Sequence, residues 1–497
     1  MARLTVASRR LSPRLAAAIL VFVTTGYFQN TQPRWGVSSQ FAAVCALVER
    51  GTLCIDDYHE HPELETGDKA LVGGHFYSDK SPVTSFLGVP AYFSYWLVKS
   101  SGGRPIKYAT ARYWTTWWTI GTAAAAVAWM VATLLMRHGV DETAAAPIAA
   151  LWIASTPLLG YSILFYNYLP ACAGLMGGYL AIEPTLRSPA PATPPASRLF
   201  VGGALFGVAA WTLATVALAA LIASVALAVR LGCARCTRLW SWVGGGLAGA
   251  LGYAIYGWLL FGRIASPYEF EYHADFRDGM AQGLMGAGWP DPYVMLLITV
   301  HPFRGLFLHF PATAIAFVGV TWAIARSVQG RPSRTAATPF AVALALFAGL
   351  VLYCGGYFMW WGGWSYAPRH LIPGLPLLSL GLVPWARGSA WTRGVLVSVL
   401  VVGAATNASA VAVDPQPPPG LAEEALLHPA SVSEWPSPFF DLLRAAWAGG
   451  TDKNWGTRLG LRGLWSLAPL GALWCIALAR MSRPTRGSGG TPVGRDP

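Results

Sequence analysis

Most residues that could do chemistry lie in one polar stretch, which runs from Leu53 to Pro90. Charged residues make up only 12% of the chain, yet this stretch holds a dense group of carboxylates, histidines and lysines. Its acidic pair, Asp56 and Asp57, follows a short apolar run. A carboxylate that is held in place and partly shielded from water can act as general base for an alcohol, so this pair is the candidate catalytic group. An exposed acidic turn is the simpler explanation of two adjacent aspartates.

A second group of candidates is cationic and consists of Lys80, Arg304 and Arg369. Each stands where a polar loop meets a long apolar run. A cation at such a boundary normally extends to the aqueous interface or forms an ion pair, which accounts for any single one of them. Three on one side of the protein fit an anionic headgroup better, because the planar guanidinium of arginine matches phosphate oxygens. These residues are the candidate phosphate site.

Aromatic residues form a third group, in which three tryptophans between Tyr357 and Tyr366 surround Gly362 and Gly363. An interfacial aromatic belt is the simple explanation. The density exceeds what anchoring needs, and aromatic faces beside glycine backbone suit stacking against a sugar. The candidate substrate contacts are His75, Tyr77, Asp79, Trp364 and Tyr366.

Composition indicates which elements must position these residues. The chain has 497 residues, of which 54% are hydrophobic. Apolar runs near twenty residues recur along it, which is the length that crosses a bilayer core of about 30 Å. The sequence therefore predicts an all-α polytopic membrane protein. The formal net charge of +12 does not indicate a nucleic-acid partner, because the arginines gather in short loops at the ends of apolar runs, as the positive-inside rule predicts.

Loop charge and apolar runs together predict about twelve transmembrane helices, with the N-terminus in the cytosol. In this map the run 82–98 returns to a basic cytosolic loop, 99–112, and the run 113–135 goes out again. The run 199–229 is a single crossing. The predicted crossings are 14–30, 82–98, 113–135, a hairpin of two within 144–181, 199–229, 240–262, 304–326, 337–356, 370–386, 394–412 and 465–480.

The map divides the chain into three parts. Residues 1–412 form a transmembrane catalytic module whose first outer loop is 31–81, residues 413–464 form an outer segment, and residues 465–497 form the last crossing and a basic cytosolic tail. Within the first outer loop, Ser38 and Ser39 can cap a short helix that ends at Gly51 and lies in the membrane surface. The acidic, histidine-rich and aromatic loops all fall on the outer face, so the chemistry is expected there.

The cysteines predict little. Cys233 and Cys236 form a single CxxC pair, and without a second pair a metal or redox role is the less favoured interpretation. Cys45 and Cys54 both fall on the outer side, where a disulfide is open to them but not favoured.

Several motifs resemble those of bacterial GT-C-type membrane glycosyltransferases, in the branch related to protein O-mannosyltransferases and aminoarabinose transferases. The motifs are Ile55-Asp56, Gly67-Asp68, the stretch from Gly74 to Pro82 with its YSDK-x-P core, Arg304-Gly305-Leu306-Phe307, and GGWS-x-x-PR followed by His370 to Pro373. The resemblance runs in order from Arg34 to about Leu470. The sequence departs from the family's motifs at two places, which bear on acceptor binding and on any metal site. Tyr168 stands where histidine is expected, and the segment 211–217 lacks an acidic residue.

The resemblance implies an inverting glycosyltransferase of the cell envelope that works on the outer, periplasmic or extracellular face of the cytoplasmic membrane. Its donor would be a polyprenyl-phosphate sugar, its acceptor a glycan, lipid or protein hydroxyl, and its surroundings membrane lipids. Asp56 matches the catalytic aspartate of the family. No cofactor is certain, and a divalent cation stays open. The alternatives are a polysaccharide ligase or polymerase that uses a lipid-diphosphate donor, and a lipid or sugar transporter, which would carry more charges inside its crossings.

Overall fold

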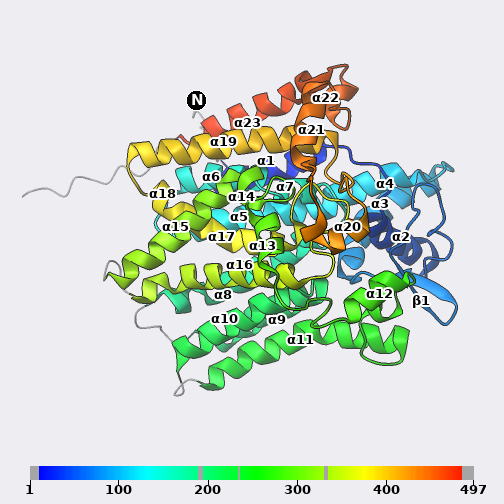
Figure 1. The fold of residues 1–497 in the computed structure, drawn as a ribbon, viewed down its shortest axis with the longest axis horizontal. Helices are drawn as coiled ribbons and strands as arrows, with labels where there is room; N and C mark the ends of the chain where they lie inside the picture. The colour runs from blue at the N-terminus through cyan, green and yellow to red at the C-terminus, as the bar shows by residue number, and fades with distance from the viewer. Residues whose placement is uncertain (1–10, 189–193, 233–235, 330–333, 484–497) are drawn as a thin grey trace, which may run out of the picture.

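The computed structural model describes residues 11–188, 194–232, 236–329 and 334–483. Figure 1 shows a bundle of roughly parallel helices with loops and short helices gathered at one end. The predicted helical class is confirmed, with one addition. Strands β1 (Lys69–Val72) and β2 (His75–Ser78) form an antiparallel hairpin in the first polar loop.

The helices differ widely in length. Those of thirteen residues or more are α1 (Pro13–Tyr27), α2 (Trp35–Arg50), α3 (Val83–Ser101), α5 (Thr122–Arg137), α6 (Glu142–Ala154), α8 (Tyr168–Arg187), α9 (Ala196–Thr212), α10 (Val216–Leu231), α11 (Cys236–Phe261), α15 (Pro311–Val328), α16 (Thr338–Gly356), α19 (Ala390–Val413) and α23 (Ala468–Met481). The shorter ones are α4 (Tyr108–Thr116), α7 (Leu158–Ser162), α12 (Ala274–Ala281), α13 (Pro292–Thr299), α14 (Leu306–His309), α17 (Leu375–Leu378), α18 (Leu382–Ala386), α20 (Glu423–Leu427), α21 (Pro438–Trp447) and α22 (Trp455–Arg458).

Six helical runs in the described residues are long and apolar enough to cross a membrane. They are Tyr108–Arg137, Thr237–Phe261, Pro311–Val328, Thr338–Gly356, Ala390–Val413 and Gly463–Met481. Four further apolar helices are shorter, namely α1, α6, α9 and α10. The chain is thus a membrane protein with several spans, and the total of twelve stays a prediction.

The run 199–229 is not the single crossing that was predicted. Helix α9 ends at Thr212, and α10 begins at Val216 after Leu213 adopts an extended backbone. The run contains no proline and no charged residue, and its polar residues Thr212, Thr215 and Ser224 also occur inside helices, so the sequence does not reveal the break. Both helices pack against α8, and α11 lies along α9. The prediction of one helix here is wrong.

The basic segment 99–112 lies against the first polar loop rather than across the membrane from it. The guanidinium of Arg112 donates a hydrogen bond to the carbonyl of Glu63 (2.8 Å) and another to the carbonyl of Thr31. The Ala109 N–H donates to the Glu63 carboxylate at 3.1 Å. Figure 1 accordingly shows α2, α3, α4 and β1 together at one end of the bundle. The predicted return at 82–98 is wrong, because Arg112 is buried and bonded to carbonyls instead of being exposed to the cytosol.

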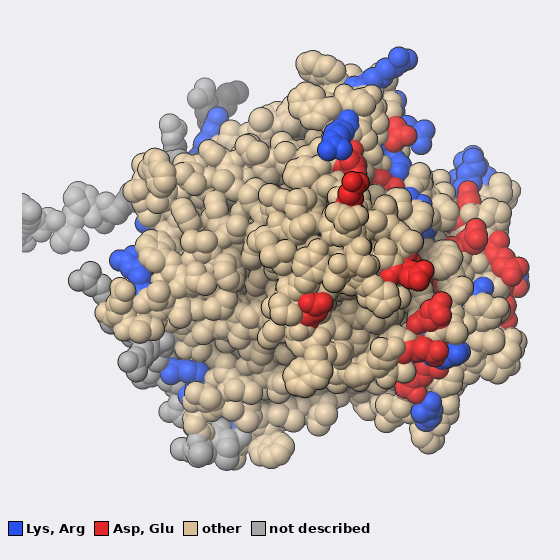
Figure 2. Space-filling view, in the orientation of Figure 1, with Lys and Arg blue, Asp and Glu red and all other residues tan. Residues whose placement is uncertain are grey.

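The opposite end of the bundle contains the start of α1. Arg14 forms an ion pair with Glu142 at 3.1 Å, and Arg387 donates to the carbonyl of His138 at 3.3 Å. The run Tyr108–Arg137 therefore leads from the first polar loop toward the start of α1, which reverses the direction predicted for 113–135. In Figure 2 this end, on the left, shows basic side chains, and the acidic ones gather on the right.

These contacts predict which introduced cysteines a thiol reagent reaches at each end of the bundle. Cysteines placed singly at Glu60 and Arg104 in a cysteine-free background should react together with a membrane-impermeant thiol reagent in intact cells, because both residues are exposed at one end. Cysteines at Asp141 and Arg393, exposed at the other end, should then stay unlabelled until the membrane is permeabilised. Labelling of position 104 together with 141, and not with 60, would contradict the arrangement.

The helix predicted in the first polar loop is longer than expected. Helix α2 begins at Trp35, so Ser38 and Ser39 lie inside it, and both are buried. The Ser39 hydroxyl shares a 2.7 Å hydrogen bond with that of Ser78, which explains why serines stand inside a helix. The predicted end at Gly51 is confirmed, with a left-handed φ of 69° that favours glycine.

The thiols of Cys45 and Cys54 are both free, so these two residues do not form the disulfide that was left open and was not favoured. Cys45 is buried in α2, whereas Cys54 is partly exposed in the turn before the hairpin. Cys233 and the side chain of Cys236 lie outside the described residues, so the CxxC prediction is not tested.

Candidate active site

A cavity of about 770 Å³ opens where the first polar loop meets the bundle. One part of its lining is apolar and comes from α9, α10 and α11, including Trp211, Leu213, Ala214, Ala217 and Ala250. The other part is polar and includes Arg34, Asp68, Asp79, Lys80, Tyr166 and Arg369. The break between α9 and α10 is thus a wall of the cavity. A long apolar chain with a charged head is the kind of ligand that such a lining accepts.

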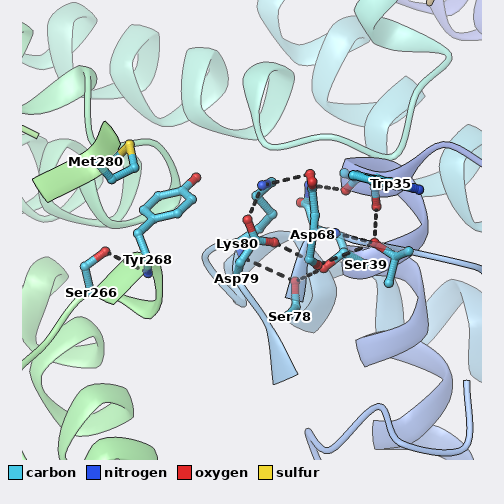
Figure 3. A network of polar contacts seen from close by, with 12 residues as sticks. Trp35, Ser39, Asp68, Ser78, Asp79, Lys80, Ser266, Tyr268 and Met280 are labelled. Atoms are coloured by element: carbon cyan, nitrogen blue, oxygen red, sulfur yellow. Dashed lines mark hydrogen bonds and ion pairs between the residues drawn. The ribbon is translucent and has the colours of Figure 1, made fainter. Parts of the chain in front are cut away.

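The end of β2 delivers Asp79 and Lys80 to this cavity. The Lys80 ammonium lies 2.9 Å from the Asp68 carboxylate and also contacts Asp79. Figure 3 shows this group with Ser39, whose hydroxyl is 3.3 Å from the Asp79 carboxylate. Two carboxylates neutralise one ammonium, so Lys80 has little positive charge left for an anionic ligand.

Arg369 is a cation of the cavity wall that has no carboxylate partner among the described residues. The turn before it places Gly362 and Gly363 at φ 73° and 61°, and a Cβ on Gly362 would come within 2.9 Å of the Arg369 side chain. These glycines therefore make room for the guanidinium, which donates to the Tyr166 hydroxyl at 3.0 Å. Its Nε has no hydrogen-bond partner, and no carboxylate in the described ranges forms an ion pair with it. A buried guanidinium without a counter-ion favours an anionic ligand at this point.

Arg34, at the start of α2, is a second arginine that the cavity exposes to a ligand. Its guanidinium pairs with Asp414 at 2.8 Å and lies over the Trp364 ring, 4.7 Å from the centroid. The ion pair joins the first polar loop to the segment after α19, which ends at Val413. The sequence reasoning treated Arg34 only as the beginning of the family resemblance, and no local pattern marked it as part of a site.

Glu271, which the sequence reasoning also missed, adds a third carboxyl group beside Lys80. The segment after α11 joins the edge of β1, where the Tyr272 N–H donates to the Lys69 carbonyl at 2.9 Å. This pairing brings Glu271 against Asp79. Burial and then the neighbouring Asp79 raise the pKa of Glu271 to about 9. Burial likewise raises the pKa of Asp79, so the two groups retain a proton at neutral pH.

The raised pKa of Glu271 predicts a pH-dependent stability. The folded protein holds this proton up to about pH 9, whereas the unfolded chain releases it near the ordinary value of 4.5. The stabilisation is therefore complete below pH 4.5 and is lost as the pH rises toward 9. Melting temperatures of the purified protein should fall across that interval, and Glu271→Gln should flatten the decline. Glu269→Gln, which changes an exposed carboxylate paired with Arg263, is the control. Equal slopes in all three proteins would contradict the assignment.

The structure brings four of the predicted site residues to the cavity wall, namely Asp79, Lys80, Trp364 and Arg369. Six others do not line it: Asp56, Asp57, His75, Tyr77, Arg304 and Tyr366. The remaining polar lining includes Asp68 and Tyr166, which were not predicted as site residues. A signal for Asp68 existed, since Gly67-Asp68 is one of the family-like motifs.

Asp56 and Asp57 lie on an exposed turn before the hairpin. One Asp56 oxygen accepts the Phe76 N–H at 2.7 Å, and the other lies 2.7 Å from His75 Nδ1. Burial acts to raise the pKa of Asp56, but these two hydrogen bonds outweigh it and leave the pKa below its usual value. Asp57 forms an ion pair with Arg50 at 3.3 Å. A lowered pKa weakens a base, and the catalytic role of this pair stays a prediction.

Arg304 and Tyr366 lie behind the cavity wall. The fully buried Arg304 guanidinium donates to the Gly363 carbonyl at 3.0 Å, which holds the glycine turn that precedes Arg369. Tyr366 is also fully buried and stacks on Phe439. Both residues support the turn from behind, which is a different position from the predicted contact with phosphate or sugar.

Comparison with known proteins indicates the fold. No protein-family model matches the chain, and no curated protein matches it. Among solved structures, ArnT from Cupriavidus metallidurans bound to undecaprenyl phosphate superposes with a TM-score of 0.53 at 13% identity, over 94% of this chain and 76% of that one. The apo state of the same ArnT superposes with a TM-score of 0.51 at 12% identity, over 94% of this chain and 76% of that one.

An oligosaccharyltransferase from Archaeoglobus fulgidus in its apo form also matches, with a TM-score of 0.40 at 14% identity, over 95% of this chain and 57% of that one. The motif resemblance predicted the same group of proteins as the superposition on ArnT, and it is confirmed at the level of the fold. This chain has the fold of ArnT from Cupriavidus metallidurans.

Proposed function

We propose that this protein is a membrane glycosyltransferase that takes its sugar from a polyprenyl-phosphate donor. The observation that carries the proposal is Arg369, a buried guanidinium on the cavity wall with no carboxylate partner in the described residues. The phosphodiester of such a donor supplies the missing negative charge and two oxygens that the planar guanidinium can bind together, and so does the polyprenyl phosphate that leaves. ArnT, whose fold this chain shares, was crystallised with undecaprenyl phosphate, which is a ligand of that chemistry.

The apolar part of the cavity suits the lipid of such a donor. Helices α9, α10 and α11 contribute alanines, Leu213 and Trp211, and these side chains offer no hydrogen bond to a polar ligand apart from the indole N–H. A polyprenyl chain that lies along this wall would place its phosphate at Arg369. The sugar would then extend toward Trp364 and the carboxylates around Lys80.

Asp68 is the carboxylate best placed to act as general base. It lines the cavity, and its ion pair with Lys80 fixes the direction of its side chain. Asp79 is fully enclosed and shares its proton with Glu271, so it is a weaker candidate. In the proposed reaction Asp68 takes the proton of an acceptor hydroxyl, whose oxygen attacks the anomeric carbon with inversion. The bond from that carbon to the phosphate oxygen breaks, and the polyprenyl phosphate leaves with its new charge at Arg369.

The proposal includes the side of the membrane. All the cavity-lining charged residues belong to the end of the bundle with the first polar loop, and the basic loops predominate at the other end. By the positive-inside rule the cavity faces the periplasmic or extracellular side of the cytoplasmic membrane. The acceptor, a glycan, lipid or protein hydroxyl, would approach from that side.

The direct test is consumption of defined donors by the purified, full-length protein in lipid nanodiscs. Polyprenyl-monophosphate sugars should be turned over, with release of polyprenyl phosphate. Turnover of diphosphate-linked donors alone would support the ligase or polymerase alternative and contradict the proposal. Movement of a donor across a vesicle membrane without bond cleavage would identify a transporter instead.

A further inference from the structure

We propose that Cys54, Asp56 and His75 form a zinc site beside the first residue of β2, near the turn of the β1–β2 hairpin and outside the cavity. One potential ligand atom from each residue lies within 4.8 Å of the other two. His75 Nδ1 is 2.7 Å from the Asp56 carboxylate and 3.9 Å from the Cys54 sulfur. Neither contact belongs to the proposed transfer reaction, so this site is independent of that function.

The spacing matches what a tetrahedral zinc ion requires. With a Zn–S distance of about 2.3 Å and Zn–N and Zn–O distances of about 2.0–2.2 Å, neighbouring ligand atoms lie roughly 3–4 Å apart. Small side-chain rotations would replace the Asp56–His75 hydrogen bond by two metal bonds. The three side chains are partly or fully exposed, which leaves the fourth position to water. Binding would release the proton of the Cys54 thiol to solvent.

The ligand types select the metal. A thiolate and an imidazole favour zinc over magnesium or calcium, which prefer oxygen ligands. Among the described residues Cys54 forms no disulfide, since its thiol is free and Cys45 is buried within α2. The site is therefore distinct in chemistry from the all-carboxylate group around Lys80.

The backbone already holds the three ligands in place. Cys54 forms a β-bridge with Tyr77, and the Ile55 N–H donates to the Phe76 carbonyl at 2.8 Å. The Phe76 N–H in turn holds one Asp56 oxygen and leaves the other beside His75. A hydrogen bond that orients a metal-binding carboxylate in this way is a common feature of zinc sites. Zinc would connect the turn to β2, the strand directly before the cavity residue Asp79.

The test measures metal binding by purified, full-length protein that carries Cys233→Ser and Cys236→Ser, because the CxxC pair could itself bind zinc. After treatment with a chelator, the protein is titrated with Zn²⁺ against a chromophoric chelator, and separately with Co²⁺ to observe the thiolate-to-cobalt absorption band. We expect one equivalent of metal and a band from a single thiolate. Cys54→Ser should abolish the band. His75→Ala should weaken Zn²⁺ binding at least about tenfold, because even the loss of a residue that only orients a zinc ligand lowers metal affinity by that factor.

Two matched controls keep the result interpretable. Cys475→Ser removes another exposed free thiol, and Asp57→Asn removes the adjacent carboxylate, so both proteins should bind metal as the parent does. Melting temperatures measured without metal check that each variant is folded, and added Zn²⁺ should raise that of the parent but not that of Cys54→Ser. Absence of a one-to-one complex in the parent, or a band that survives Cys54→Ser, would overturn the proposal.

Discussion

Asp68→Asn should bind the donor and yet lose at least about 10²-fold in turnover, which is the usual scale of general-base effects. Asparagine keeps the size of aspartate and can still accept a hydrogen bond from Lys80, but it cannot take a proton from the acceptor. The measurement is release of polyprenyl phosphate by purified protein at saturating donor, with melting temperature recorded for each variant. Because Lys80 keeps its contact with Asp79, the variant should remain folded.

The comparison with Asp56→Asn decides between the two candidate bases. Asp56 lies on an exposed turn outside the cavity lining, so its loss should reduce turnover far less than the loss of Asp68. Asp57→Asn, which removes an exposed carboxylate paired with Arg50, serves as the reference for changes on that turn. A large loss in Asp56→Asn with near-normal turnover in Asp68→Asn would return the catalytic role to Asp56, as the family resemblance implies.

Arg369→Lys should weaken donor binding even though it keeps the positive charge. A lysine presents a point charge in place of the planar fork, and the ammonium would lose the hydrogen bond to Tyr166. A hydrogen bond to a charged group contributes about 1.5–3 kcal/mol, which corresponds to roughly 10- to 100-fold in affinity. Arg369→Ala should weaken binding further. Binding of a polyprenyl phosphate without sugar, measured by displacement of a fluorescent lipid, isolates this contact from catalysis.

A matched control for Arg369 lies at the other end of the bundle. Arg387 is bonded to the carbonyl of His138 and lies far from the cavity lining in the chain's fold, so Arg387→Lys should leave lipid-phosphate affinity unchanged. Equal affinity in the parent, Arg369→Lys and Arg369→Ala would show that the phosphate binds elsewhere and that Arg369 only packs against Tyr166.

Local sequence patterns determined those features of this protein that depend on a few adjacent residues. Apolar runs identified most of the bundle helices, and Gly51 correctly ended α2 because its left-handed backbone is a local property. Lys80 and Arg369, which the motifs marked as site residues, both line the cavity, and their roles there stay predictions. In both motifs the charged residue stands at the boundary of a loop and an apolar helix, and such a boundary is visible in the sequence.

Only the tertiary structure decided which charges meet. The basic residues 99–112 looked cytosolic by composition, but Arg112 is bonded to carbonyls of the first polar loop. Glu271 meets Asp79 through a strand pairing between segments that lie about two hundred residues apart in the chain. Asp56 does not line the cavity, although it belongs to the same polar stretch as Lys80. The charge of a loop and the spacing of its residues describe only which residues are neighbours along the chain. The pKa of a carboxyl group, and the ligand that an arginine can bind, depend on burial and on neighbours in space, which distant segments supply.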